Sequence, residues 1–382
     1  MAMEPVTFLV GCLCLGLVLW DVFQTIVVPR PTPGRFRITR YLIAPTWSAW
    51  RALGVRSRSD LARDQFYGLY APAAVIMLLG AWLLLLTVGY GLVLFAVRAD
   101  LEPAPADLLS AIYLGGNSIL TLGSAGAVAV GPLGRLFTLL AAATGLGVVA
   151  LAVTFLFSLY GSFQRREALV VMLLARATAP PSAVTLLETY GRLGMAGELP
   201  TLFSEWERWS AEVLDSHVAY PILCYFRSSH DNASWISALG AVLDAAALVL
   251  TTIRGVPHGS AKLMTRVGSH LVEDVSNYFR LPGDGATVDR MAFDHAHGRL
   301  AAAGYDVEDA ERAWHAFVRV RGTYAGRLEA LARFWATPAP IWLGERTTFV
   351  SFLSPVHRVP SPAPADSAAE ALADRTPERA VE

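Results

Sequence analysis

The sequence predicts an all-α membrane protein with three transmembrane helices, a re-entrant helix and loop, and a cytoplasmic all-α domain. Three apolar runs, near residues 6–28, 67–97 and 134–163, are each long enough to cross a hydrocarbon core of about 30 Å. The 382-residue chain is 54% hydrophobic, and its first half is far more apolar than its second half. After residue 166 the pattern changes to helices of ordinary soluble length. We therefore expect four parts: 1–66, a helix and basic loop; 67–166, the re-entrant module; 167–354, the helical domain; and 355–382, a disordered tail.

The first apolar run ends at Pro29 and is expected to be a retained transmembrane helix. The segment before it carries no positive charge, and no small-residue cleavage site follows it, so a secretory signal peptide is disfavoured. Asp21 lies inside this run, and an acid at that depth must face protein or water. We favour a carboxylate that is hydrogen-bonded to a neighbouring helix, or that lies near the headgroups, over one with a role in transport.

The segment 30–63 is rich in arginine and is expected to be cytoplasmic by the positive-inside rule, which places the amino terminus outside. Its aromatic and apolar residues indicate an amphipathic helix in the membrane interface: Tyr41, Leu42, Trp47 and Trp50. The run 67–97 returns the chain to the outside, where 98–107 is acidic. The third run then ends at Arg165 and Arg166 on the cytoplasmic side.

The segment 107–135 is too short and too rich in glycine to cross a bilayer as one helix. Asp107 is placed to cap a short helix that reaches about Ser118. The residues that follow cannot continue a regular helix: Thr121, Leu122, Gly123, Ser124, Ala125 and Gly126. Irregular backbone at membrane depth must be buried in protein or line water, and its carbonyl groups can replace the hydration shell of a cation. We therefore predict that this loop is an ion pathway.

Gly145 and Gly147 fall in the middle of the third run. Glycine there permits either close helix packing or bending at a gating hinge, and both interpretations stay open.

The soluble part predicts a helical bundle. Pro180 and Pro181 should end the helix that continues from the membrane, Ser182 should cap the next one, and Thr201 should open another. The apolar run 235–253, with capping candidates at Asp231, Asn232 and Ser234, approaches membrane-spanning length. Because Asp244 interrupts it, we favour a buried central helix over a membrane-associated one. Further helices are expected at 261–279, 287–303 and 307–335.

Composition and motifs argue against several functions. The formal charge of −1 gives no basis for nucleic-acid binding, and three cysteines without zinc-like spacing predict neither a disulfide framework nor a metal site. Ser229, His230 and Asp231 are adjacent and cannot form a catalytic triad, while His295 and His297 should point to different faces of a helix. We expect no enzyme activity and no cofactor.

Three motifs of the re-entrant segment resemble the two-transmembrane, pore-loop potassium channel family. They are Ala111-Ile112-Tyr113-Leu114, like the pore helix of that family; Thr121-Leu122-Gly123, like the first half of its filter; and Pro132-Leu133-Gly134-Arg135, like the start of its inner helix. Their register holds across all three motifs without a gap, and the resemblance covers roughly 67–166. The chain departs from the family at Ser124, Ala125 and Gly126, where the family has Tyr, Gly and Asp.

The resemblance implies a passive cation channel in a bacterial plasma membrane, with K⁺ as the first expected ion. It also implies a homotetramer, because one loop supplies a quarter of a filter ring, and a hinge near Gly145. The alternative is a non-conducting, channel-like scaffold or sensor that acts through its cytoplasmic helical domain.

Overall fold

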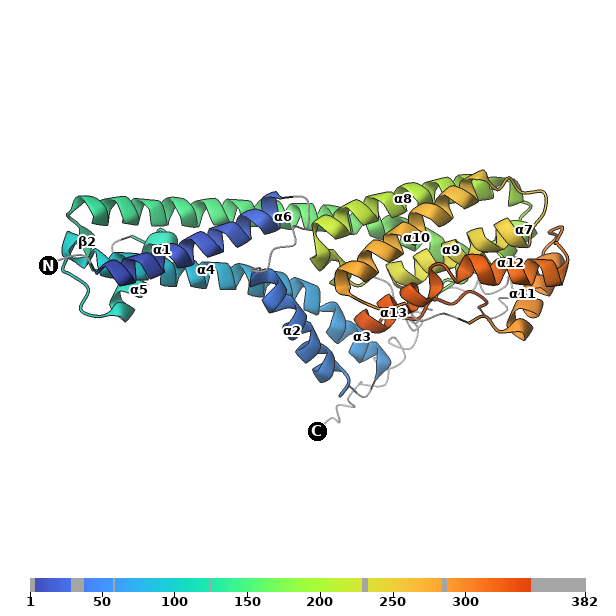
Figure 1. Cartoon of the computed structure of the whole chain (residues 1–382), viewed down its shortest axis with the longest axis horizontal. Helices are drawn as coiled ribbons and strands as arrows, with labels where there is room; N and C mark the ends of the chain where they lie inside the picture. Colours follow the sequence, from blue (N-terminus) through green and yellow to red (C-terminus); the bar gives the residue numbers. More distant parts are fainter. Residues whose placement is uncertain are drawn as a thin grey trace, which may run out of the picture. The chain divides into compact units, whose positions relative to one another are not determined.

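The computed structural model describes residues 4–28, 38–57, 59–123, 126–228, 233–283 and 287–344, and these residues are mostly helical (Figure 1). Three helical stretches are long and apolar enough to cross a membrane: 5–27, 60–96 and 132–177. The predicted tail, 355–382, lies outside the described residues.

The first helix, α1 (Pro5–Val22), is followed by a π-helical turn, η1 (Phe23–Val27). Pro5 stands in its first turn, where a missing amide hydrogen costs nothing. Val18 and Val22 are buried in one cluster with Trp82 of the long helix α4 (Tyr70–Ala96). The outward side of α1 remains exposed and apolar.

Between these two long helices the chain forms an elbow of two shorter helices, α2 (Ile38–Gly54) and α3 (Asp60–Gly68). The interfacial prediction for this segment was wrong for Trp47, which is 3% exposed and donates its indole hydrogen to the carbonyl of Phe334, 3.3 Å away. Trp50 stacks on Phe66. The indole of Trp47 therefore faces protein, because a distant helix covers it.

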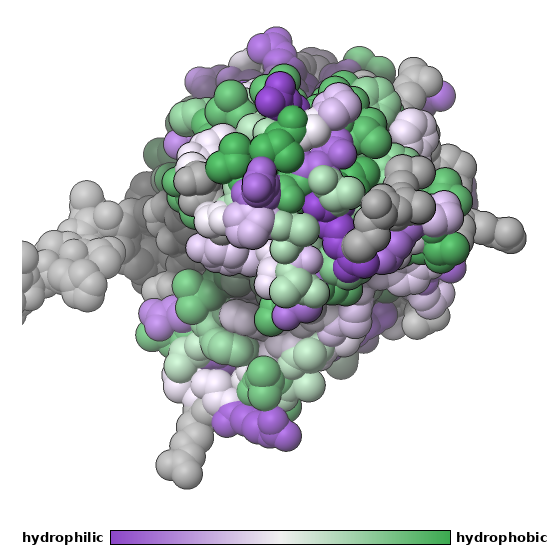
Figure 2. Space-filling view, turned by 90° about the vertical axis from the view of Figure 1, so that its left-hand side faces the viewer, coloured by the Kyte–Doolittle hydropathy of each residue, from purple (hydrophilic) through white to green (hydrophobic). Residues whose placement is uncertain are grey.

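At the far end of α4 lie η2 (Arg98–Asp100), β1 (Leu101–Glu102), α5 (Leu108–Ile119) and β2 (Val128–Ala129). The two strands pair antiparallel, with Leu101 opposite Ala129. Asp107 caps α5 as predicted, since its Oδ1 accepts the amide of Ser110 at 2.8 Å. Figure 2 looks onto this end of the molecule, where hydrophobic and hydrophilic residues lie side by side.

The longest helix, α6 (Pro132–Ala177), has 46 residues and is therefore about 69 Å long. Asp100 caps its start by accepting the amides of Leu133 and Gly134. The helix continues beyond its long apolar part and stops before Pro180, as predicted. The predicted boundary between residues 166 and 167, however, falls inside this unbroken helix.

The remaining helices pack into one domain around α9 (Trp235–Thr251), which is buried from Trp235 to Val249. Figure 1 shows α8 and α10 on one side of it and α12 and α13 on the other. The elements of this domain are α7 (Ala183–Arg192), η3 (Ala196–Glu198), α8 (Leu199–Ala219), η4 (Pro221–Tyr225), α10 (Gly259–Phe279), α11 (Arg290–Ala302), α12 (Ala310–Arg321) and α13 (Ala325–Trp335). The favoured interpretation of 235–253 as a central helix agrees with this burial.

Capping side chains explain most of the helix starts in this domain. Ser182 caps α7, and Ser234 forms a capping box with Ser237 at the start of α9. Two predicted bounds were wrong. The helix α8 begins at Leu199 rather than Thr201, because Pro200 fits the first turn. The segment 307–335 divides into α12 and α13.

Candidate functional site

The short helix α5 packs so closely against α4 and α6 that the backbones of the helices are in contact. A Cβ on Gly91 of α4 would lie 2.6 Å from the Cα of Ile112, and one on Gly115 would lie 2.8 Å from the amide nitrogen of Gly91. Glycine at these two positions removes the side chains that would separate the helices. The position of α5 is therefore fixed by its contact with α4.

The loop that follows α5 begins with a Schellman cap. The amide of Leu122 donates to the carbonyl of Asn117 at 3.1 Å, and the amide of Thr121 donates to that of Ser118 at 3.2 Å. Thr121 takes the left-handed conformation with φ 53°, which is unusual for a β-branched residue. Gly123 follows with φ 108°. The helix thus ends sharply and turns the chain into the loop.

Four of the six predicted ion-pathway residues are described. Thr121, Leu122 and Gly123 are exposed, and Gly126 is exposed with φ 80°. Ser124 and Ala125 lie outside the described residues. The two glycines hold backbone conformations that other residues adopt only with strain, which explains why the loop needs them.

Gly145 and Gly147 of α6 differ in their surroundings. Gly145 is buried, and a Cβ there would fall 2.1 Å from the carbonyl oxygen of Ile119, at the end of α5. Gly147 has no atom of the described residues within 4 Å of the corresponding position. Gly145 therefore has a packing reason to be glycine, while Gly147 faces open space.

Asp21 joins three helices. Its carboxylate accepts the indole hydrogen of Trp82 at 2.8 Å, the amide of Ile38 at 3.0 Å and the hydroxyl of Thr39 at 3.2 Å. The side chain is buried, and its partners come from α4 and from the start of α2. This is the hydrogen-bonded arrangement favoured above for an acid inside the first run.

Both α5 and α6 leave large apolar side chains uncovered. On α6 they include Leu139, Leu146 and Phe157, which share one helix face because seven and eleven residues separate them. On α5, Leu109 and Tyr113 are exposed in the same way. Contiguous apolar surface of this kind is covered in a native assembly by lipid or protein.

The carboxyl-terminal half of α6 contains a buried arginine, Arg166. Its guanidinium donates to Glu167, to Nε2 of His217 at 3.1 Å and to the carbonyls of Leu223 and Phe226 at 3.0 and 2.8 Å. Because arginine has no acceptor, Nε2 of His217 must be unprotonated. Burial, and then the charge of Arg166, lower the pKa of His217.

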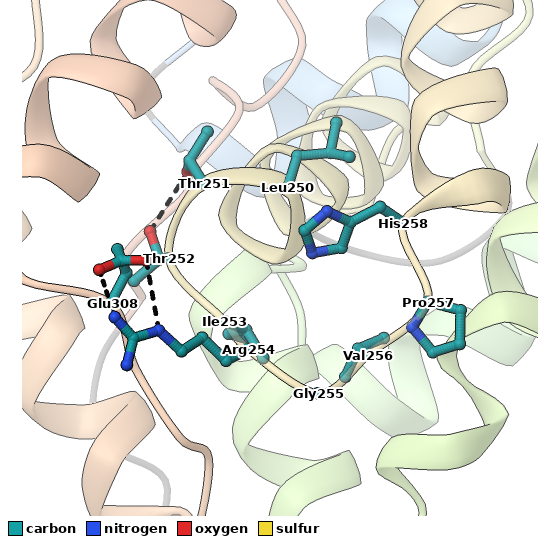
Figure 3. Close-up of a pocket in the computed structure, with 10 residues that line it drawn as sticks. All are labelled: Leu250, Thr251, Thr252, Ile253, Arg254, Gly255, Val256, Pro257, His258 and Glu308. Carbon is teal, nitrogen blue, oxygen red and sulfur yellow. Dashed lines mark hydrogen bonds and ion pairs between the residues drawn. The ribbon is translucent and has the colours of Figure 1, made fainter.

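A surface cavity of about 480 Å³ lies at the turn between α9 and α10 (Figure 3). Arg254 and Glu308 pair on one side of it and His258 lies on the other. The guanidinium is already engaged by the carboxylate, so this cavity contains no unpaired charge that would select a ligand.

Among the described residues, the other motifs of the helical domain form no metal-binding cluster. His297 contacts the carbonyl of Glu308 at 2.8 Å. Within the described ranges, no cluster of three or more His, Cys, Asp or Glu side chains could hold a metal ion. The segment Ser229-His230-Asp231 lies outside the described residues.

Sequence reasoning missed two features of the site region, the core position of Arg166 and the docking of Trp47. An arginine after an apolar run is the usual sign of a membrane boundary, so its sequence position gave no signal of burial.

No family model, no curated protein and no solved structure matches the chain.

Proposed function

We propose that this chain is one subunit of a homotetrameric cation channel in a bacterial plasma membrane, with the amino terminus outside and the helical domain in the cytoplasm. The observation that carries the proposal is the end of α5, where the carbonyl end of a helix meets exposed backbone at Thr121, Leu122 and Gly123. A helix directs partial negative charge toward its carboxyl end, which favours a cation there.

The flanking helices supply the second argument. With α4 and α6 across a bilayer, α5 and its loop lie at membrane depth, because α5 packs against both of them. Polar backbone cannot face lipid without a large free-energy cost, so the exposed loop requires water or protein beside it. A water-filled path along the loop meets this requirement.

The tetramer rests on the surface of α5 and α6. One loop per chain provides only part of a ring of carbonyl groups. The exposed apolar faces that include Tyr113 of α5 and Leu146 of α6 give neighbouring copies a surface to pack against. Lipid would cover the outward side of α1.

The proposed mechanism is passive permeation past the carbonyl groups of Thr121 to Ala125. K⁺ is the first candidate ion, although Ser124, Ala125 and Gly126 differ from the potassium filter pattern. Gating would require α6 to rotate or bend where Gly145 contacts α5. The helical domain would bias this motion, since its hydrophobic core includes side chains from the carboxyl-terminal half of α6.

Ion flux through purified protein in liposomes tests the proposal. We expect K⁺ or Na⁺ flux that Gly123→Asp abolishes, because a carboxylate there changes both the charge and the backbone conformation. Gly16→Ala is a matched control, since Gly16 sits in α1 with no atom within 4 Å of an added Cβ. The absence of any cation flux from well-folded protein, with or without Gly123→Asp, would exclude the channel.

A non-conducting, channel-like scaffold or sensor is the second candidate. The left-handed conformation of Thr121 favours it, because that residue closes a helix cap rather than extending the loop. The double variant Ser124→Tyr, Ala125→Gly distinguishes the channel from the scaffold. K⁺ flux gained by the double variant would indicate an intact pore with an altered loop, whereas the continued absence of K⁺ flux would support the scaffold.

A further inference from the structure

The carboxyl end of α13 is held by side chains that lie outside this helix. Trp47 of the elbow donates to the carbonyl of Phe334, and Arg227 donates to the carbonyls of Trp335 and Ala336 at 2.8 and 2.7 Å. Last-turn carbonyls have no partner within their helix, and cationic donors are favoured there. We call this set of interactions the elbow contact.

An ion pair completes the elbow contact. Arg227 binds Asp64 of α3, and its guanidinium lies 5.1 Å from the ring centre of Tyr67. The Arg227 side chain is only 10% exposed, but that of Asp64 is 42% exposed, so bulk water and salt reach the pair from the Asp64 side. Salt weakens an exposed pair far more than a buried one.

The elbow contact is incompletely satisfied. Trp47, Arg227, Trp335 and Thr337 line a small cavity. The indole nitrogen of Trp335 and the hydroxyl of Thr337 are buried without a protein partner among the described residues. Separation of the elbow from α13 would give both groups bulk water, which offsets part of the cost of exposing Trp47 and Tyr67, now 3% and 2% exposed.

The second attachment of the helical domain, on α6, is buried more deeply on both sides of its ion pair, although Oε2 of Glu167 has no partner among the described residues. Arg166 is 1% exposed, and each of its guanidinium nitrogens has a partner. The indole of Trp209 also donates to the Arg166 carbonyl at 2.9 Å. Separating a buried guanidinium from its partners is strongly unfavourable. We therefore expect the attachment on α6 to persist when the elbow contact opens.

We infer that the helical domain stays fixed to α6 and undocks reversibly from the elbow. The elbow is tied in turn to α1 and α4 through Asp21, whose partners include Ile38 and Trp82. The docked state therefore links α6 to the outer helices through the helical domain, and undocking removes that link. The undocking does not depend on conduction; its role as a control on α6 rotation rests on the proposed function.

Hydrogen exchange measured by mass spectrometry on the full chain in lipid nanodiscs tests the inference. Asp64→Asn removes the charge that holds Arg227, and we expect exchange in 325–337 to rise about fivefold. Exchange in 199–219, on the side of the domain joined to α6, should not change. Asp60→Asn is the matched control, because Asp60 pairs with Arg63 inside the elbow.

A second measurement needs no variant. Raising sodium chloride from about 0.05 M to about 0.5 M should increase exchange in 325–337 of the unmodified chain, and again leave 199–219 unchanged. Equal rises in both segments would mean general loosening and would overturn the inference, as would no rise under either condition. Neither readout depends on ion flux. Failure of the channel proposal is therefore recognised separately, by the Gly123→Asp experiment.

Discussion

The carbonyl oxygen of Ile119 occupies the space that a side chain on Gly145 would need, since a Cβ built there falls 2.1 Å from that oxygen. Ile119 is the last residue of α5, and Gly145 lies inside α6. The backbone of α6 thus supports the end of α5 directly before the exposed loop. Any change of this contact must move either the helix or the loop.

We expect Gly145→Ala to destabilise the protein by about 1–3 kcal/mol, because the added methyl group overlaps backbone that cannot rotate away. Gly147→Ala should be neutral or slightly stabilising, since alanine favours helix and the position is open. Thermal unfolding in detergent measures both. Equal effects of the two substitutions would contradict the packing role of Gly145.

Gly123→Ala should strain the loop by about 1–3 kcal/mol, because φ 108° is accessible almost only to glycine. The side chain itself meets no atom within 4 Å among the described residues, so the effect is one of backbone conformation. In liposomes the variant should reduce flux while the unfolding temperature of the helical domain stays the same. A flux equal to that of the unmodified chain would show that the loop does not need this conformation.

Arg321→Met should be strongly destabilising, by about 3–5 kcal/mol, because it leaves Asp244 buried with only the Tyr324 hydroxyl as partner. Burial already raises the pKa of Asp244 and opposes its charge. Arg290→Met is the control. Its ion pairs with Asp294 and Glu311 are exposed, and their loss should change chemical denaturation little.

The stability of the helical domain should fall as the pH drops below about 6.5. Burial lowers the pKa of His217 in the folded state, so unfolding takes up a proton at acid pH. This contribution is fully present above the unfolded-state pKa and is lost as the pH falls toward the folded-state pKa. Each pH unit in that window removes up to about 1.4 kcal/mol.

Replacing His217→Gln keeps an acceptor for Arg166 and removes the titration. The difference in unfolding temperature between pH 7.5 and pH 5.5 should therefore shrink in this variant. His270→Gln, at an exposed site beside Asp274, should leave the difference as it is. A pH response that is the same in all three proteins would assign the acid sensitivity to other groups.

Local signals in the sequence predicted much of the fold. Hydrophobic length predicted the three long helices, and short side chains before apolar segments predicted the caps at Asp107, Ser182 and Ser234. Each of these signals acts within a few residues. The break between α12 and α13 was missed, although Gly322 at the end of α12 is a common signal of a helix end.

The long-range contacts could not be predicted in the same way. Trp47 and Phe334 are 287 residues apart, and periodicity shows which face of a helix is apolar but not what covers it. The candidate loop was located by its glycines. The close approach of Gly145 to Ile119 could not be predicted, because a glycine in a membrane helix fits packing and bending equally well.

The unbroken course of α6 decides which pieces of this protein can fold alone. Phe155 and Leu159, from its long apolar part, belong to the same hydrophobic core as Trp209 and Leu239 of the helical domain. A fragment that begins at residue 167 would lose these side chains together with Arg166, and His217 would be left without its donor. The core of the helical domain is therefore completed only when the preceding part of α6 is in place, so its folding depends on the folding of that helix.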